Sequence, residues 1–256
     1  MYNSAKQSDR RPIMKTKQRN WMLWVFVLVV FAYVQWAVLS TVATFYYPGG
    51  TIPNHDTVGY SFWSNTFSDM GRRVSLSGEP NTVSRVIWET SMYIYELILC
   101  LFFAVLPRLF SKAKSARRLA TIGSIFGITA MVLLFIATSA PMDLHESIHN
   151  TASLVSYGAI GVALILYSIA IFRNESFPKT YAYVLVAYII ILVAGGVIGI
   201  ISIPNWETEW GNMLISTYEH IQGYIELIFI PIVAYGAWRV DKRLRDLGPE
   251  SMLGKD

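Results

Sequence analysis

Residues 145–149 read HESIH, a string that matches the H-E-x-x-H pattern of zinc hydrolases. Histidines four positions apart share one face of a helix and can bind the same metal ion, while the glutamate between them activates a water molecule. Such a site needs a third ligand, for which His220 or Glu219 is the candidate. The metal hypothesis places zinc between His145, His149 and His220, with Glu146 or Asp69 as the general base.

A local explanation competes with the metal hypothesis. Asp143 and Glu146 form a D-x-x-E pattern, which is a variant of the capping box at the start of a helix. Acidic residues in a first turn also suit the helix dipole. In this interpretation Glu146 stabilises the helix start and His145 is incidental. Only His149 then remains a candidate site residue.

Four glutamates occur inside apolar stretches, in two pairs with the same spacing. Glu89 and Glu96 are seven residues apart, as are Glu219 and Glu226. Seven residues return to nearly the same helix face, so each pair forms an acidic stripe. An ionised carboxylate inside a bilayer costs roughly 3 kcal/mol or more, so we expect these groups to face the bundle interior. There they bind a cation, share a proton or line a wet cavity. The plainer alternative is that Glu96 and Glu226 are neutral acids, hydrogen-bonded to Tyr93, Tyr95, Gln222 or the backbone.

Apolar side chains dominate the chain that carries these residues. Of its 256 residues 54% are hydrophobic and 15% are charged, and the mean hydropathy is +0.41. This balance is typical of a polytopic membrane protein. Six stretches reach the about 20 apolar residues that cross a bilayer as a helix: 21–47, 85–107, 119–140, 148–172, 180–204 and 213–238. The sequence thus predicts an all-α integral membrane protein with six transmembrane helices in one bundle.

The distribution of Lys and Arg predicts the orientation of this bundle. Of the 21 basic residues, only Arg72, Arg73 and Arg85 lie on the side of the long loop, so both termini are predicted to be cytoplasmic. The basic residues thus act as topology determinants, and we expect no nucleic-acid partner despite a pI near 9.1. The predicted parts are a basic cytoplasmic tail (1–20), a transmembrane domain (21–240) with an outer loop (48–84), and a cytoplasmic tail (241–256).

Glycines in the fifth span predict close packing of helices. Gly195 and Gly199 form a G-x-x-x-G pattern, which lets the backbones of two membrane helices approach. This face is a candidate contact for a membrane-protein partner. Cys100 is the only cysteine, so no intramolecular disulfide is possible.

Several short motifs occur along the chain, in the outer loop and at the ends of the spans. They are FSDMG at 67–71, a following Pro-Asn pair, APMD at 140–143, HN at 149–150, YEHIQ at 218–222 and the pair Trp238–Arg239. In this order they resemble the six-span membrane family of the domain of unknown function 998 type and, more distantly, the Frag/DRAM/Sfk group. The resemblance covers nearly all of the chain after the N-terminal tail.

The resemblance implies that Asp69 and His149 matter most for function. Within the HESIH string only His149 and Asn150 match the family pattern. The family has an arginine after the glutamate of the sixth span, where this chain has His220, and this difference removes a permanent cation. Members of the Frag/DRAM/Sfk group are associated with membrane-lipid and lipid-anchor handling, so a lipid is the implied ligand.

Three functions remain open from the sequence. In the first, polar residues of the outer half bind a lipid, a lipid-anchored partner or an ion; these residues are Asp69, His149, Glu219, His220, Glu89, Glu96 and Glu226. The second is a metal-dependent membrane hydrolase or acyl transferase that uses the zinc site above. The third is a proton-coupled transporter in which the four glutamates form a proton path. The first is favoured because no complete catalytic set accompanies the polar residues.

Overall fold

The structure is a computed structural model that describes residues 20–110 and 113–246. Within these residues there are six long α-helices, three short 3-10 helices and no strand. The long helices are α1 (Trp21–Thr44), α2 (Thr82–Val105), α3 (Lys114–Thr138), α4 (Met142–Phe172), α5 (Thr180–Ser202) and α6 (Glu209–Asp246). The 3-10 helices are η1 (Phe67–Gly71), η2 (Leu106–Phe110) and η3 (Ile203–Asn205).

Each of the six long helices is long and apolar enough to cross a membrane, which confirms the predicted fold class. The predicted span limits differ most at two helices. α4 begins at Met142 rather than at 148, and α6 continues to Asp246 rather than ending at 238. Residues 241–246 of the predicted tail therefore continue α6. The remaining tail residues, 1–19 and 247–256, lie outside the described residues.

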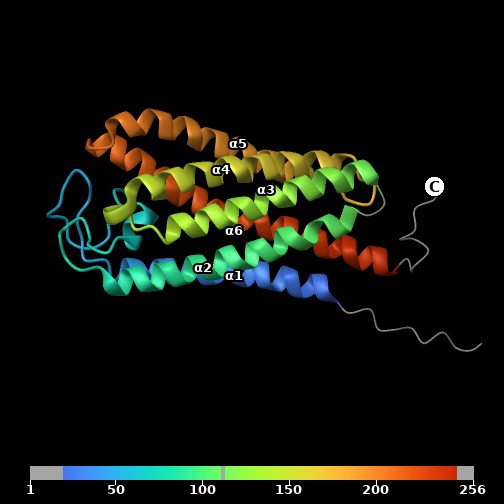
Figure 1. The fold of residues 1–256 in the computed structure, drawn as a ribbon, viewed down its shortest axis with the longest axis horizontal. Coiled ribbons are helices and arrows are strands. Elements are labelled where there is room, and N and C mark those ends of the chain that lie inside the picture. Colours follow the sequence, from blue (N-terminus) through green and yellow to red (C-terminus); the bar gives the residue numbers. More distant parts are fainter. Residues whose placement is uncertain (1–19, 111–112, 247–256) are drawn as a thin grey trace, which may run out of the picture.

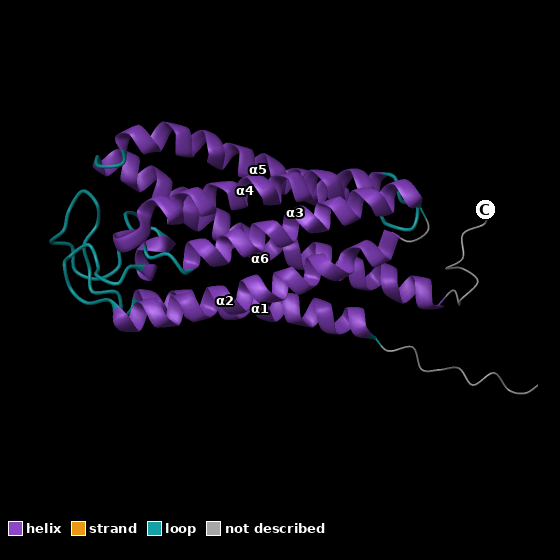
Figure 2. Ribbon diagram, viewed as in Figure 1, coloured by secondary structure: helices purple, strands orange, loops and turns teal. Residues whose placement is uncertain are grey.

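The six helices form a closed ring. Each packs against its neighbours in sequence, and α1 completes the ring by packing against α6. α1 begins and α6 ends at one end of the bundle, which we call the inner end (Figure 1). The loop 45–81, which contains η1, covers the opposite, outer end (Figure 2). Short connections between the other helices favour this up-and-down arrangement.

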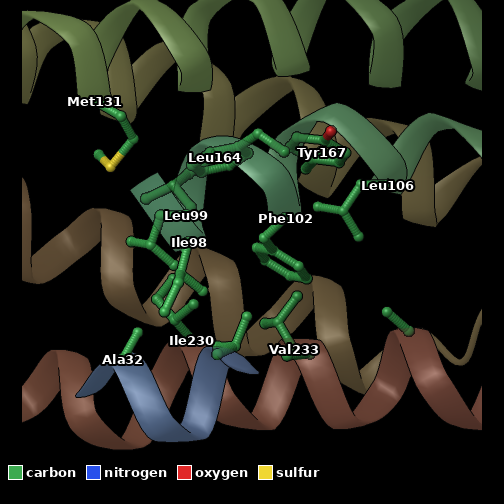
Figure 3. Close-up of a cluster of buried hydrophobic side chains, with 14 of the residues drawn as sticks. Ala32, Ile98, Leu99, Phe102, Leu106, Met131, Leu164, Tyr167, Ile230 and Val233 are labelled. Carbon is green, nitrogen blue, oxygen red and sulfur yellow. The ribbon is translucent and has the colours of Figure 1, made fainter. Parts of the chain in front are cut away.

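The inner half of the ring is filled by apolar side chains. Phe102, Leu106, Leu164, Tyr167 and Val233 converge there from α2, η2, α4 and α6 (Figure 3), and all are buried. Between membrane helices such contacts stabilise mainly through van der Waals packing. This inner core closes the ring at its inner end.

Asp69 holds the loop over the outer end. It is 1% exposed, and its carboxylate accepts hydrogen bonds from the Thr66 N–H at 2.9 Å and the Asn65 amide at 3.3 Å. Arg72 pairs with the same carboxylate at 3.0 Å. The Thr66 hydroxyl accepts the Asp69 N–H in return, which completes a capping box at η1. The contacts of Asp69 are therefore those of a residue that shapes the loop.

The start of α4 differs from the predicted capping box. The N-cap residue is Pro141, and no side chain caps the helix. The Asp143 carboxylate instead accepts the backbone N–H groups of Arg73 and Val74, at 3.0 and 3.1 Å. The predicted capping box of Asp143 and Glu146 is therefore wrong, because the Asp143 carboxylate accepts hydrogen bonds from the outer loop and not from the first turn of α4.

The two glycines of the G-x-x-x-G pattern in α5 have different surroundings. A Cβ on Gly195 would lie 1.9 Å from the ring of Tyr218, so α6 packs directly against this glycine. The Tyr218 hydroxyl also donates a hydrogen bond to the Ile191 carbonyl at 2.8 Å. Gly199 has no neighbouring atom within 4 Å of its Cβ position. Gly195 thus serves the fold, and a partner at the Gly199 face stays a prediction.

Candidate functional site

A cavity of about 120 Å³ lies inside the ring, between the inner core and η1. All six helices and η1 contribute to its lining. Its polar lining residues are Ser68, Thr138, His149, Ser153, Ser156, Glu219, Gln222 and Glu226. Aromatic rings come from Tyr33, Trp36, Phe67, Trp88, Tyr95, Phe103, Tyr157 and Tyr188, and aliphatic walls from Met92, Leu99, Met131, Leu134, Ile160 and Ile230. A cavity of roughly 150 Å³ binds benzene, so this one has room for a group of similar size.

Glu226 lies at the centre of a hydrogen-bonded group of tyrosines. Tyr95 donates to one carboxylate oxygen at 2.9 Å, and Tyr188 donates to the other. Because the Tyr95 proton is used in this way, the Tyr33 hydroxyl, 3.2 Å from that of Tyr95, acts as its donor. Three helices, α1, α2 and α5, therefore position one carboxylate of α6.

Glu219 is the second carboxylate of the cavity and lies toward the outer end. Backbone N–H groups of Phe67 and Ser68, at the start of η1, donate to it. Glu219 and Glu226 share a face of α6 and line the same cavity, as their spacing predicts. Between them, Gly223 leaves space for two rings, because a Cβ there would be 2.8 Å from Trp36 and 3.0 Å from Phe67.

His149 forms part of the outer wall of the cavity. Its Nδ1 lies 2.9 Å from the Ala137 carbonyl and 3.1 Å from the Ala140 carbonyl, so this nitrogen carries the proton. In the neutral ring Nε2 is then an acceptor, and the Ser68 hydroxyl lies 3.1 Å away. His149 thus fixes the end of α3, the start of α4 and η1 to one another.

His220 faces the outer loop rather than the cavity. Its Nδ1 donates to the Ser216 carbonyl at 2.6 Å, and its Nε2 lies 2.9 Å from the Tyr60 hydroxyl. The rings of Phe62 and Phe67 cover it, with centroids 4.3 and 4.4 Å away. Burial, with added repulsion from the Glu219 and Asp69 carboxylates, raises the pKa of Tyr60 well above its ordinary value. Tyr60 therefore stays protonated and able to donate.

The two glutamates of α2 have separate environments and do not form one acidic stripe. Glu89 pairs with Arg85, one turn away, at 3.2 Å. Glu96 is 2% exposed and accepts a hydrogen bond from Thr138 at 2.8 Å. Across the described residues, no hydrogen bond joins any two of the carboxyl groups of Glu89, Glu96, Glu219 and Glu226. The proton path through the four glutamates therefore stays a prediction.

The three histidines of the metal hypothesis do not meet. Within residues 20–110 and 113–246, no group of three His, Cys, Asp or Glu side chains is arranged to hold a metal ion. His145 is exposed, whereas His149 is buried. The backbone leaves the helical conformation at His145 (φ −136°, ψ 42°), so the pair does not lie on a regular helix face. His220 is engaged by the outer loop.

The sequence did not identify most of the aromatic lining. Tyr33, Trp88 and Tyr188 each have a polar atom within an apolar span, and that combination is the signal that could have identified them. Tyr95, an expected partner of the central glutamates, does donate to Glu226. Trp88 is 4% exposed, and its indole N–H has no hydrogen-bond partner in the described part of the chain. Ser68 carried no signal, because its place depends on how the loop folds over the ring.

Tyr157 is the most exposed of the residues that line the cavity. This residue lines the cavity and is also 44% exposed. It shares a helix face with Leu154, which is 73% exposed, and with Gly161, which has no neighbour within 4 Å of its Cβ position. The middle of α4 lies at mid-height in the ring.

No protein-family model, curated protein or solved structure matches this chain. The resemblance to the family of the domain of unknown function 998 type therefore stays a prediction.

Proposed function

We propose that this six-helix membrane protein binds the polar end of a lipid-like amphiphile inside its ring. The observation that carries the proposal is the central cavity, whose carboxylates, hydroxyls and amide are surrounded by apolar and aromatic walls. Binding sites for small molecules commonly combine a mostly apolar lining with a few placed polar groups. The cavity volume suits a headgroup-sized polar part.

The path into the cavity supports a ligand that comes from the membrane. η1 lies over the outer end through Phe67 and Ser68, and the inner core fills the opposite end. Tyr157 borders both the cavity and the exposed side of α4. A molecule can therefore place its polar end in the cavity while its chain remains among the lipids.

Photolabelling of the purified full-length chain tests the proposal. The probe is hexadecanol with a diazirine beside the hydroxyl-bearing carbon, added to protein in maltoside micelles and activated by light. We expect peptide mass spectrometry to find adducts on the cavity residues Glu219, Glu226 and Tyr157. Ser153 lines the cavity without a side-chain hydrogen bond, so Ser153→Phe should fill the space and reduce labelling severalfold.

The matched control is Leu154→Phe, which adds a ring at the exposed neighbouring position. It should leave labelling of the cavity unchanged, and both variants should unfold at the temperature of the wild type within a few degrees. Labelling confined to exposed residues of the bundle, with no effect of Ser153→Phe, would contradict the proposed function.

A further inference from the structure

We propose that the polar group bound in this cavity is an ammonium group, so that the ligand is a hydrophobic amine. This inference rests on the proposed function and adds the chemical class of the ligand. It is carried by three features of the lining: its charge, the hydrogen bonds of Glu226, and the aromatic rings beside them.

The lining holds two carboxyl groups and no basic partner for them other than His149. Glu219 and Glu226 both line the cavity, and none of its described lining residues is Lys or Arg. His149 is the one basic side chain there. Its Nδ1 donates to two carbonyls, which leaves Nε2 to accept from Ser68 in the neutral ring. When either carboxyl group is ionised, a positively charged ligand can supply the cation that the protein does not place there.

The hydrogen bonds of Glu226 suit an ionised carboxylate. Both oxygens accept from phenols, and neither needs a proton of its own to make these bonds. The two carboxylate oxygens have four lone pairs; the two phenols and the Gln222 amide use three of them, which leaves one for a further donor. A carboxylate without a counter-ion is unfavourable away from water, and a bound cation relieves that penalty. An ammonium group supplies both the charge and the N–H donors.

Aromatic rings surround the position that such a cation would take. Tyr95 and Tyr188 hold Glu226 directly, and the Trp36 ring lies 6.4 Å from that of Tyr95, centroid to centroid. Trp36 approaches α6 closely because Gly223 has no side chain. Ring faces attract ammonium ions, most strongly where water is excluded. A carboxylate among such rings is a site for an amine with an apolar substituent.

The same lining disfavours a phosphate. Phosphate groups in proteins are bound by Arg, Lys or clustered backbone amides. No Arg or Lys lies among the described lining residues, and the backbone amides of Phe67 and Ser68 at the start of η1 already donate to Glu219. The ligand is therefore an amine without a phosphate beside its nitrogen. It comes either from the membrane, as a long-chain amine, or from water, as a short one.

Equilibrium binding of tritiated hexylammonium tests the assignment. The full-length chain is kept in maltoside micelles, which contain no amine, and the signal of empty micelles is subtracted. Tritiated hexanol, of the same chain length and without charge, is measured in parallel. We expect hexylammonium to bind the wild type at least tenfold more tightly than hexanol, because a charge-assisted hydrogen bond adds about that factor or more.

Glu226→Gln keeps the shape of the side chain and removes its charge. It should weaken hexylammonium binding about tenfold or more and hexanol binding by a clearly smaller factor, because hexanol carries no charge. The control is Glu89→Gln, which alters the ion pair with Arg85 outside the cavity and should change neither affinity. Thermal unfolding of each variant checks that it remains folded.

The outcomes separate the two proposals. If neither hexanol nor hexylammonium binds the wild type, the proposed function itself fails. If hexanol binds but hexylammonium binds no better, or if Glu226→Gln leaves hexylammonium binding intact, the ammonium assignment is wrong while the cavity remains a ligand site. Competition then identifies the source of the amine. Stronger competition by hexadecylammonium indicates a membrane amine, and stronger competition by butylammonium indicates a water-soluble one; both results support the ammonium assignment.

Discussion

The imidazole of His149 links three elements at the outer end of the cavity. Nδ1 donates to the carbonyls of Ala137, in the last turn of α3, and Ala140, just after that helix. Nε2 lies beside the Ser68 hydroxyl of η1. Its neighbours in the HESIH string, His145 and Glu146, are exposed. His149 is therefore a positioning residue. In a metal-binding helix of the H-E-x-x-H type, both histidines would instead face one metal ion.

Replacing this histidine should destabilise the fold. His149→Ala removes the imidazole donor from two buried carbonyls, of which that of Ala137 keeps the Ala140 N–H, and we expect it to lower the free energy of unfolding by about 1–3 kcal/mol. His145→Ala is the matched control, because the side chain is exposed and its loss should change stability by no more than about 0.5 kcal/mol. Thermal unfolding in maltoside micelles measures both. Equal midpoints for the two variants would contradict the positioning role.

Part of the site was predictable residue by residue. The seven-residue spacing placed Glu219 and Glu226 on one face of α6, and both line the cavity. The same spacing failed on α2, because Glu89 has Arg85 one turn away and Glu96 has Thr138 of another helix. Spacing along a helix defines faces, whereas partners on other helices decide what each face contacts.

At the scale of the elements, the sequence predicted the six helices well because their apolar length is a local property. The starts of α4 and α6 were placed too late, since Asp143 and Glu209 are polar and yet helical. Closure of the ring by α1 and α6 was not predictable, because it depends on contacts between residues far apart in the chain. The cavity follows from that closure.

The contact between α5 and α6 gives a test at this scale. Gly195→Ala would place a methyl group against the Tyr218 ring and disturb its hydrogen bond to Ile191. We expect a loss of about 1–3 kcal/mol in stability, as for other overpacked contacts. Gly199→Ala meets open space and is the control, with little or no loss. Unfolding midpoints compare the two, and a Gly195→Ala variant as stable as Gly199→Ala would refute this packing.

At the scale of the whole molecule, the even number of helices places both ends of the described chain at the inner end (Figure 1). The basic residues predict that this end is cytoplasmic. Val58 of the outer loop is 93% exposed, and Glu175 in the α4–α5 connection is exposed at the inner end. These two positions can report the orientation.

Labelling of single cysteines measures which end of the bundle is cytoplasmic. In a Cys100→Ser background, Val58→Cys should react with a membrane-impermeant maleimide in intact cells. Glu175→Cys should react only after the cells are permeabilised. The reverse pattern would show that the bundle is inserted with the opposite orientation.

The central claim is that an amphiphile places its polar end beside Glu226 inside the ring. Crystals of the protein grown with 6-bromohexylammonium test it most directly, because anomalous scattering locates the bromine. We predict a bromine peak within the cavity or beside Tyr157, with density for the ammonium group next to the Glu226 carboxylate. A bromine found only on the outer surface of the bundle, with no added density beside Glu226, would contradict the claim.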